Sequence, residues 1–64
     1  MRVIATDILD KDGNLERIEY YDELGSFQFQ SLWDPDEAQT ADNRKKFREW
    51  SNRMAKRMDF EVIE

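Results

Sequence analysis

The 64-residue sequence predicts one α+β domain over residues 1–64, in which a small antiparallel sheet of three strands packs against a helix in the C-terminal half. Apolar and polar residues alternate through much of the first half of the chain, as in strands that bury one face. Two glycine-containing turns interrupt this alternation, and a helical repeat of apolar residues follows the single proline. A chain of this length has room for one core only.

Residues 2–9 and 15–21 are expected to form a hairpin. The first segment, RVIATDIL, is rich in β-branched residues, which favour strands. The five residues between the two segments, DKDGN, suit a tight reversal because Gly and Asn adopt positive φ angles readily. The return strand reads LERIEYY.

Residues 26–33, SFQFQSLW, are the third expected strand and follow a second turn at 22–25. Alternation within the three strands predicts which side chains are buried. The expected inner face comprises Ile4, Ile8, Ile18, Tyr20, Phe27, Phe29 and Trp33. The expected outer face carries Arg17, Glu19, Gln28 and Gln30, and also the apolar Val3, Leu15, Tyr21 and Leu32, which either pack at sheet edges or form an outer patch.

A helix is expected from Asp34 to about Met58, with a break near Thr40 or Asp42. The segment DPDE at 34–37 combines an N-cap carboxylate, a proline in the first turn and acids near the positive end of the helix dipole. At 100° per residue, one apolar stripe contains Phe47, Trp50, Met54 and Met58, with Ser51 and Ala55 on its flank. The last residues, 59–64, are expected to form a short final strand or an extended tail.

Charge is distributed unevenly along the chain, whose net charge is −5. Residues 1–43 carry eleven acidic and three basic side chains, a balance of −8. Residues 44–57 carry seven basic side chains and one acidic one, a balance of +6. The sequence therefore predicts an acidic sheet and a basic helix.

The residue types present argue against catalysis, metal binding and cofactor binding. The chain contains neither cysteine nor histidine, which excludes disulfides and thiolate or imidazole metal sites. It also has no glycine-rich phosphate loop and no nucleophile motif. Asp10, Asp12 and Asn14 have the spacing that opens a calcium-binding loop, but Leu15 and Tyr21 stand where that loop needs Gly and Glu. We expect no enzyme, no cofactor and no metal, and we interpret the segment as a hairpin turn.

The favoured function is a small protein–protein interaction module, an inhibitor or adaptor that binds a protein partner with a basic surface. A cytoplasmic location is expected, because the chain has no cysteine and no apolar run long enough for a signal peptide or a membrane span. Size and charge also suit regulators encoded by viruses, phages or plasmids. A homo-oligomer, such as a homodimer paired through the edge of the first or third strand, is a further expectation. The expected partner-binding residues are Asp10, Asp12, Glu16, Glu19, Asp22 and Glu23.

The alternative function is nucleic-acid binding through the basic segment Arg44–Arg57. Basic side chains there surround the aromatic and methionine stripe and are suited to contact phosphates. The acidic remainder of the chain argues against this alternative, because it would repel a duplex. The candidate nucleic-acid-binding residues are Arg44, Lys45, Arg48, Arg53, Lys56 and Arg57.

Overall fold

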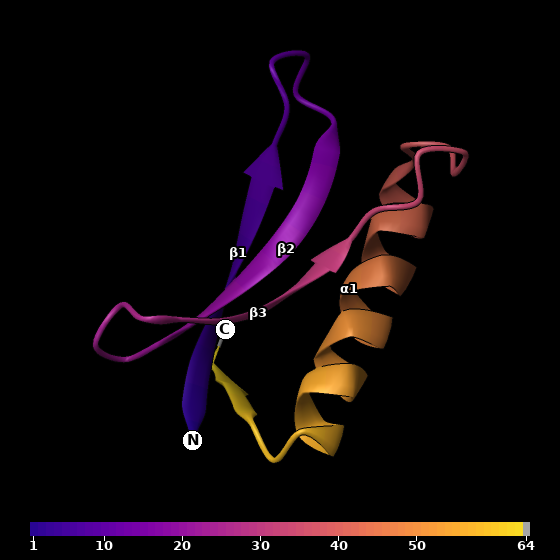
Figure 1. Ribbon diagram of the computed structural model, residues 1–64. Coiled ribbons are helices and arrows are strands. Elements are labelled where there is room, and N and C mark those ends of the chain that lie inside the picture. Colours follow the sequence, from indigo (N-terminus) through magenta and orange to yellow (C-terminus); the bar gives the residue numbers. More distant parts are fainter. Residues whose placement is uncertain (64) are drawn as a thin grey trace.

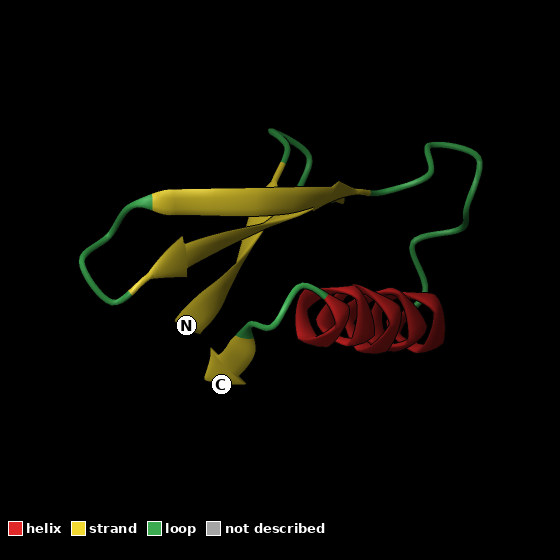
Figure 2. Ribbon diagram, turned by 60° about the horizontal axis from the view of Figure 1, so that its bottom comes forward, coloured by secondary structure: helices red, strands yellow, loops and turns green. Residues whose placement is uncertain are grey.

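The computed structural model describes residues 1–63 and has α+β architecture, with one helix packed on a four-stranded sheet (Figure 1). The elements are β1 (Arg2–Leu9), β2 (Leu15–Asp22), β3 (Phe27–Leu32), α1 (Ala41–Arg57) and β4 (Glu61–Ile63). Helix α1 covers one face of the sheet, and no other element of residues 1–63 lies over the opposite face (Figure 2). The predicted α+β class is confirmed, whereas the sheet has four strands and is mixed, in place of the three antiparallel strands expected.

The sheet is mixed and has the order β3-β2-β1-β4. The two expected hairpins are present, whereas β4 adds a fourth strand parallel to β1, with Val3 opposite Val62. The expected final strand therefore forms over 61–63, and Glu64 lies outside the described residues. Because β1 pairs on both sides, the expectation of a free first-strand edge is wrong, and β3 and β4 are the sheet edges.

Both hairpin turns are built in the same way, with an aspartate that opens the turn and a glycine inside it. The Asp10 carboxylate accepts from the backbone N–H groups of Asp12 and Asn14 at 2.8 and 3.0 Å. Asp22 accepts in the same way from Leu24 and Ser26, each at 2.9 Å. Gly13 and Gly25 have φ angles of 80° and 85°, a region that costs glycine little.

The inner face of the sheet differs from the expected one in β1 and at the start of β3. Cross-strand partners share a face, and the row Ala5–Tyr20–Phe29 faces α1. Val3 has the parity of Ala5 and is fully buried, whereas Ile4 points to the other side and is 46% exposed. The side chains packed into the core, fully or partly, are Val3, Ala5, Ile18, Tyr20, Phe29, Phe47, Ala55, Phe60 and Val62.

Two register shifts explain the remaining errors. Tyr20 pairs with Phe29 while Tyr21 pairs with Phe27, so Gln28 is an extra residue and Phe27 turns outward, where it is 51% exposed. A second register shift occurs between Ile8, which pairs with Arg17, and Leu9, which pairs with Leu15. This shift turns Leu15 inward, where it is buried instead of lying on the outer face. Ile8 pairs with Arg17, an outer-face position, and is half-buried. Ile18, Tyr20 and Trp33 are buried, as predicted.

Helix α1 begins at Ala41, at the position of the expected break, and does not begin at Asp34. The Asp34 carboxylate caps a single turn, which the Glu37 N–H closes by donating to the Asp34 carbonyl at 3.0 Å. The backbone leaves the helical conformation before α1, because Thr40 is extended, with φ −81° and ψ 157°. The Gln39 side-chain amide holds this segment to the backbone of Leu15, donating at 2.9 Å and accepting at 3.0 Å. Thr40 then provides a second N-cap, accepting from Asn43 N–H at 3.1 Å.

The face of α1 that meets the sheet is centred on Ser51 and Ala55, about a fifth of a turn from the predicted stripe. The Tyr20 hydroxyl lies 2.7 Å from Ser51 Oγ, which donates to Ser31 Oγ at 2.7 Å. All three side chains are buried, so each hydroxyl needs a partner. This network orients the helix and leaves Trp50 46% exposed, which corrects its expected place in the core.

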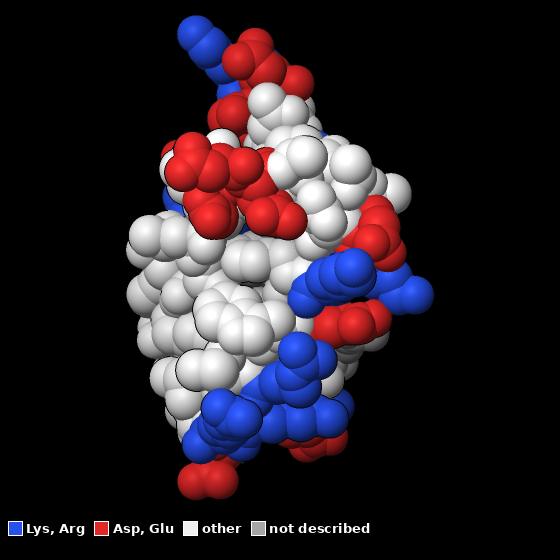
Figure 3. Space-filling model, turned by 90° about the vertical axis from the view of Figure 1, so that its right-hand side faces the viewer, with Lys and Arg blue, Asp and Glu red and all other residues white. Residues whose placement is uncertain are grey.

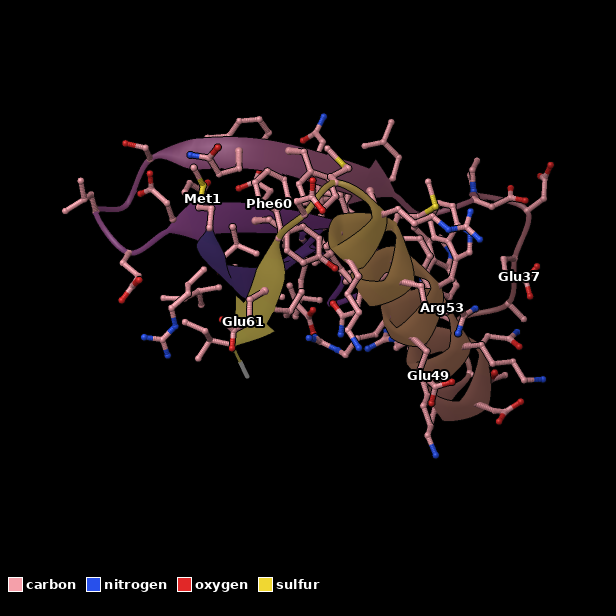
Figure 4. The ribbon with its side chains drawn as sticks, turned by 90° about the horizontal axis from the view of Figure 1, so that it is seen from below. Met1, Glu37, Glu49, Arg53, Phe60 and Glu61 are labelled. Carbon is pink, nitrogen blue, oxygen red and sulfur yellow. The ribbon has the colours of Figure 1, made fainter. Side chains whose placement is uncertain are left out.

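The C-terminal end of α1 leads directly to β4. Asp59 has a φ of 64° and ends the helix, and Phe60 then stacks on Phe29 at 5.5 Å between sheet and helix (Figure 4). The Glu61 N–H donates to the Met1 carbonyl at 2.8 Å, which joins β4 to the beginning of β1. Within residues 1–63, no helix is both long enough and apolar enough to cross a membrane.

Candidate functional site

One side of the sheet faces away from α1 (Figure 2) and is here called the open sheet face. It carries large apolar side chains. Phe27, Tyr21 and Ile4 form one row across β3, β2 and β1, and Ile63 of β4 extends it. Tyr21 and Phe27 meet edge to face, with centroids 5.9 Å apart. A second row contains Ile8, Arg17 and Leu32, of which Leu32 is 66% exposed. Clustered exposed apolar side chains of this kind mark interaction surfaces.

A polar triad on β2 connects the two rows, because Tyr21 belongs to the first row, Arg17 to the second, and Glu19 lies between them. The Glu19 carboxylate accepts from the Tyr21 hydroxyl and, at 2.8 Å, from Arg17 Nε. The hydrogen bond from Tyr21, followed by that from Arg17, holds the pKa of Glu19 below its ordinary value. Hydrogen bonding to Glu19 raises the pKa of both Arg17 and Tyr21. Arg17 also contacts Glu16 at 2.7 Å, so the triad is a fixed polar strip within an apolar surface.

The six acidic residues expected to bind a partner do not form one patch. Asp10 and Asp12 lie in the β1–β2 turn, whereas Asp22 and Glu23 lie at the β2–β3 turn, at the opposite end of the sheet (Figure 1). Glu16 and Glu19 lie on β2 between these turns. The Asp10 and Asp22 carboxylates each hold a turn together, and Glu23 lies 3.6 Å from Arg2. The acids therefore border the open sheet face at both ends and cross its middle.

The six basic candidates are divided into two groups of three. Arg44, Lys45 and Arg48 line a cleft of about 250 Å³ between α1 and the β1–β2 hairpin, together with Asp7, Leu15 and Ile18. Two of these bases are held by the protein itself. Arg44 donates to Gln39 Oε1 and to the Gly13 carbonyl at 3.0 and 3.3 Å, and Arg48 pairs with Asp7.

The second basic group, Arg53, Lys56 and Arg57, is exposed on the C-terminal half of α1. Figure 3 shows this side of the molecule, with basic side chains gathered toward the bottom and acidic ones toward the top. Uncharged surface lies between them on the left, and basic and acidic side chains are mixed on the right. Lys56 and Arg57 also lie in the last helical turn, where a positive charge interacts favourably with the helix dipole.

A third surface is an aromatic groove between α1 and the loop that follows β3. Its volume is about 260 Å³, and its lining residues are Trp33, Asp34, Glu37, Asn43, Lys46, Phe47 and Trp50. The loop side of the groove contains the single turn at 34–37, which precedes the start of α1 at Ala41.

The sequence did not assign the open sheet face or the aromatic groove as sites. An alternating pattern cannot reveal the extra residue at Gln28 that turns Phe27 outward. The sequence predicts an outer apolar patch that contains Val3 and Leu15, whereas these two residues are buried and Ile4 and Phe27 are exposed on the open sheet face. One feature of the sequence is consistent with the exposure of Trp50. Ser51, on the flank of the predicted stripe, is a hydrogen-bond partner for the buried Tyr20 hydroxyl, and this pairing turns Trp50 away from the sheet.

Within residues 1–63 there is no group of three or more acidic side chains arranged to hold a metal ion. Asp10, Asp12 and Asn14 occupy a closed hairpin turn in which the Asp10 carboxylate already binds two backbone N–H groups. The members of the Arg17–Glu19–Tyr21 triad have perturbed pKa values because they are hydrogen-bonded to one another.

Comparison of the chain with protein-family models, with curated proteins and with solved structures found no match.

Proposed function

We propose that this protein is a protein–protein interaction module that binds its partner through the open sheet face. The observation that carries the proposal is the apolar surface opposite α1, where Ile4, Phe27 and Leu32 are each about half exposed or more. A core face would bury such residues, and a solvated face would carry polar ones.

The charges around this surface define the partner. Carboxylates lie at the turns on both ends of the open sheet face, and the protein as a whole carries a net charge of −5. The partner we propose therefore has an apolar patch bordered by Lys and Arg residues, which electrostatic attraction would steer onto the acidic turns. An inhibitor or adaptor role follows from this mode of binding, because the module would cover a partner surface.

Site-specific photo-crosslinking tests the proposal. A crosslinking amino acid at position 32, on the open sheet face, should capture a discrete basic protein from an extract of the source cells, and the yield should fall as salt rises. The same group at position 57, on the outward side of α1, serves as the matched control and should capture no such species.

Two further measurements make the test decisive. Phe27→Gln should abolish the crosslink at position 32, whereas Phe27→Leu should retain it. Crosslinks of equal yield from both positions would contradict the proposal, as would crosslinks only to a second copy together with a dimer in sedimentation.

Nucleic-acid binding is the second candidate, and the observation that favours it is the cleft in which Arg44, Lys45 and Arg48 converge. We expect fluorescence anisotropy with single-stranded and duplex DNA and RNA at 20 mM salt to decide between the two. If all six basic residues contact phosphates, raising the salt concentration from 50 to 200 mM should weaken binding by about 10³-fold. Lys45→Gln and Arg53→Gln would each flatten this dependence, and no binding at 20 mM salt would eliminate the candidate.

A further inference from the structure

The aromatic groove combines ring faces with carboxylates, and it is separate from the open sheet face. Trp33 lies at its base, with its ring edge to face with Phe47 at a centroid distance of 5.1 Å. The rings of Phe47 and Trp50 are stacked, with their centroids 5.9 Å apart and an interplanar angle of 28°. The Trp33 indole N–H donates to the Glu37 carbonyl at 3.3 Å, which fixes the ring. The groove therefore presents preformed aromatic surface.

The charge at the edge of the groove is negative. Asp34 and Glu37 line it from the loop, and neither carboxylate forms an ion pair with any of residues 1–63. Lys46 lines it from the helix, and its Nζ forms an exposed ion pair with the Asp42 carboxylate at 3.1 Å. A cation that entered the groove would meet aromatic rings, the Glu37 carboxylate, and the Asp34 carboxylate, one oxygen of which already accepts from the Asp36 N–H.

We propose that the aromatic groove binds an arginine side chain of a polypeptide partner. A guanidinium is planar and weakly hydrated, so it stacks on aromatic faces while its N–H groups pair with carboxylates. At about 260 Å³ the groove is smaller than the sites that enclose drug-sized ligands, about 300 Å³ or more, and it suits one side chain. This inference does not depend on the open sheet face.

Tryptophan fluorescence tests the proposal directly, because both tryptophans of the chain line the groove. Acetyl-Gly-Arg-Gly-amide should cause a saturable change, with a dissociation constant on the order of 1 mM for a single anchored side chain. The lysine peptide should bind several-fold more weakly. The citrulline peptide, which has the same shape without the charge, should give no saturable change.

Charge-matched variants locate the site. Glu37→Gln should weaken arginine-peptide binding about tenfold, whereas Glu49→Gln, which removes the same charge from α1 outside the groove, should leave it unchanged (Figure 4). Trp50→Leu should also weaken binding, with Trp33 remaining as the fluorescent reporter. Circular dichroism should show native folding of Trp50→Leu, because Trp50 is 46% exposed.

Three results would overturn the proposal. Equal binding of the citrulline peptide would show that the groove selects shape and apolar surface. Equal losses in Glu37→Gln and Glu49→Gln would indicate a response to overall charge. The absence of a saturable signal at 20 mM arginine peptide would show that the groove binds no guanidinium.

Discussion

At the scale of single residues, the buried hydroxyl of Tyr20 decides how the two layers meet. It lies 2.7 Å from both Ser51 Oγ and Asn52 Oδ1, in a region where an unpaired polar atom is costly. The residue that faces the sheet is accordingly a serine, although a tryptophan is its immediate neighbour in the sequence. A prediction from hydrophobicity alone places Trp50 in the core, because it takes no account of the hydrogen-bond partner that the buried Tyr20 hydroxyl requires.

Tyr20→Phe should lower the free energy of unfolding by about 1–2 kcal/mol, because it leaves the serine hydroxyls with fewer partners at almost unchanged volume. Urea denaturation followed by circular dichroism would measure this loss. Tyr21→Phe removes a hydroxyl from a less buried position and should cost less. Equal losses in the two variants would contradict the structural role of the Tyr20 network.

The Glu19 carboxylate should make stability depend on pH in the acidic range. Its pKa is lowered in the folded state by Tyr21 and Arg17, so it contributes stability above its unfolded-state pKa of about 4.3 and loses that contribution as pH falls through the folded-state value. The difference in unfolding free energy between the wild type and Glu19→Gln should therefore shrink from pH 7 toward pH 3. Glu49→Gln controls for the loss of one charge. A difference that grows on acidification would reverse the assigned sign.

At the scale of elements, strands were more predictable than the beginning and rotation of the helix. Alternation and turn chemistry located both hairpins, since these signals are local. The segment DPDE at 34–37 forms a capped turn, but Thr40 is extended and the Gln39 side chain pairs with Leu15 in another element. Such a contact between distant residues leaves no periodic signal in the sequence.

Thr40→Ala should destabilise the protein by about 1 kcal/mol, because it removes the N-cap of α1. Thr40→Ser keeps the hydroxyl and should retain most of the stability in thermal or urea unfolding. Asp34→Ala, at the start expected from the sequence, caps only the isolated turn and should cost less. A larger loss in Asp34→Ala than in Thr40→Ala would mean that the helix begins earlier.

At the scale of the whole molecule, the fold is two layers with only one of the two sheet faces covered (Figure 2). The fold class and most elements could be predicted from the sequence, whereas the candidate surfaces could not. The place of Phe27 on the open sheet face depends on the register shift at Gln28, and the loop that lines the aromatic groove is held by Gln39. The charge asymmetry was visible in the sequence, but the positions of the acids at opposite ends of the sheet follow from its antiparallel topology.

The two faces of β3 should respond differently to the same substitution. Phe29→Ala should cost about 3 kcal/mol or more, since Phe29 stacks on Tyr20 at 4.3 Å within the core. Phe27→Ala on the open sheet face should cost about 1 kcal/mol or less, the range of a cross-strand pair. Equal losses in urea denaturation would show that the open sheet face is part of the stabilising core and would remove the basis for its role in binding.

The parallel pairing of β1 with β4 also governs how the molecule would respond to mechanical force. Traction applied at Met1 and Ile63 would pull two neighbouring strands past each other along their lengths, because both run in the same direction. The hydrogen bonds along Arg2–Ile4 and Glu61–Ile63 would then bear the load together, whereas a hairpin pulled from its open end breaks them one after another. The beginning and the end of the described chain thus form a clamp that resists extension by shear.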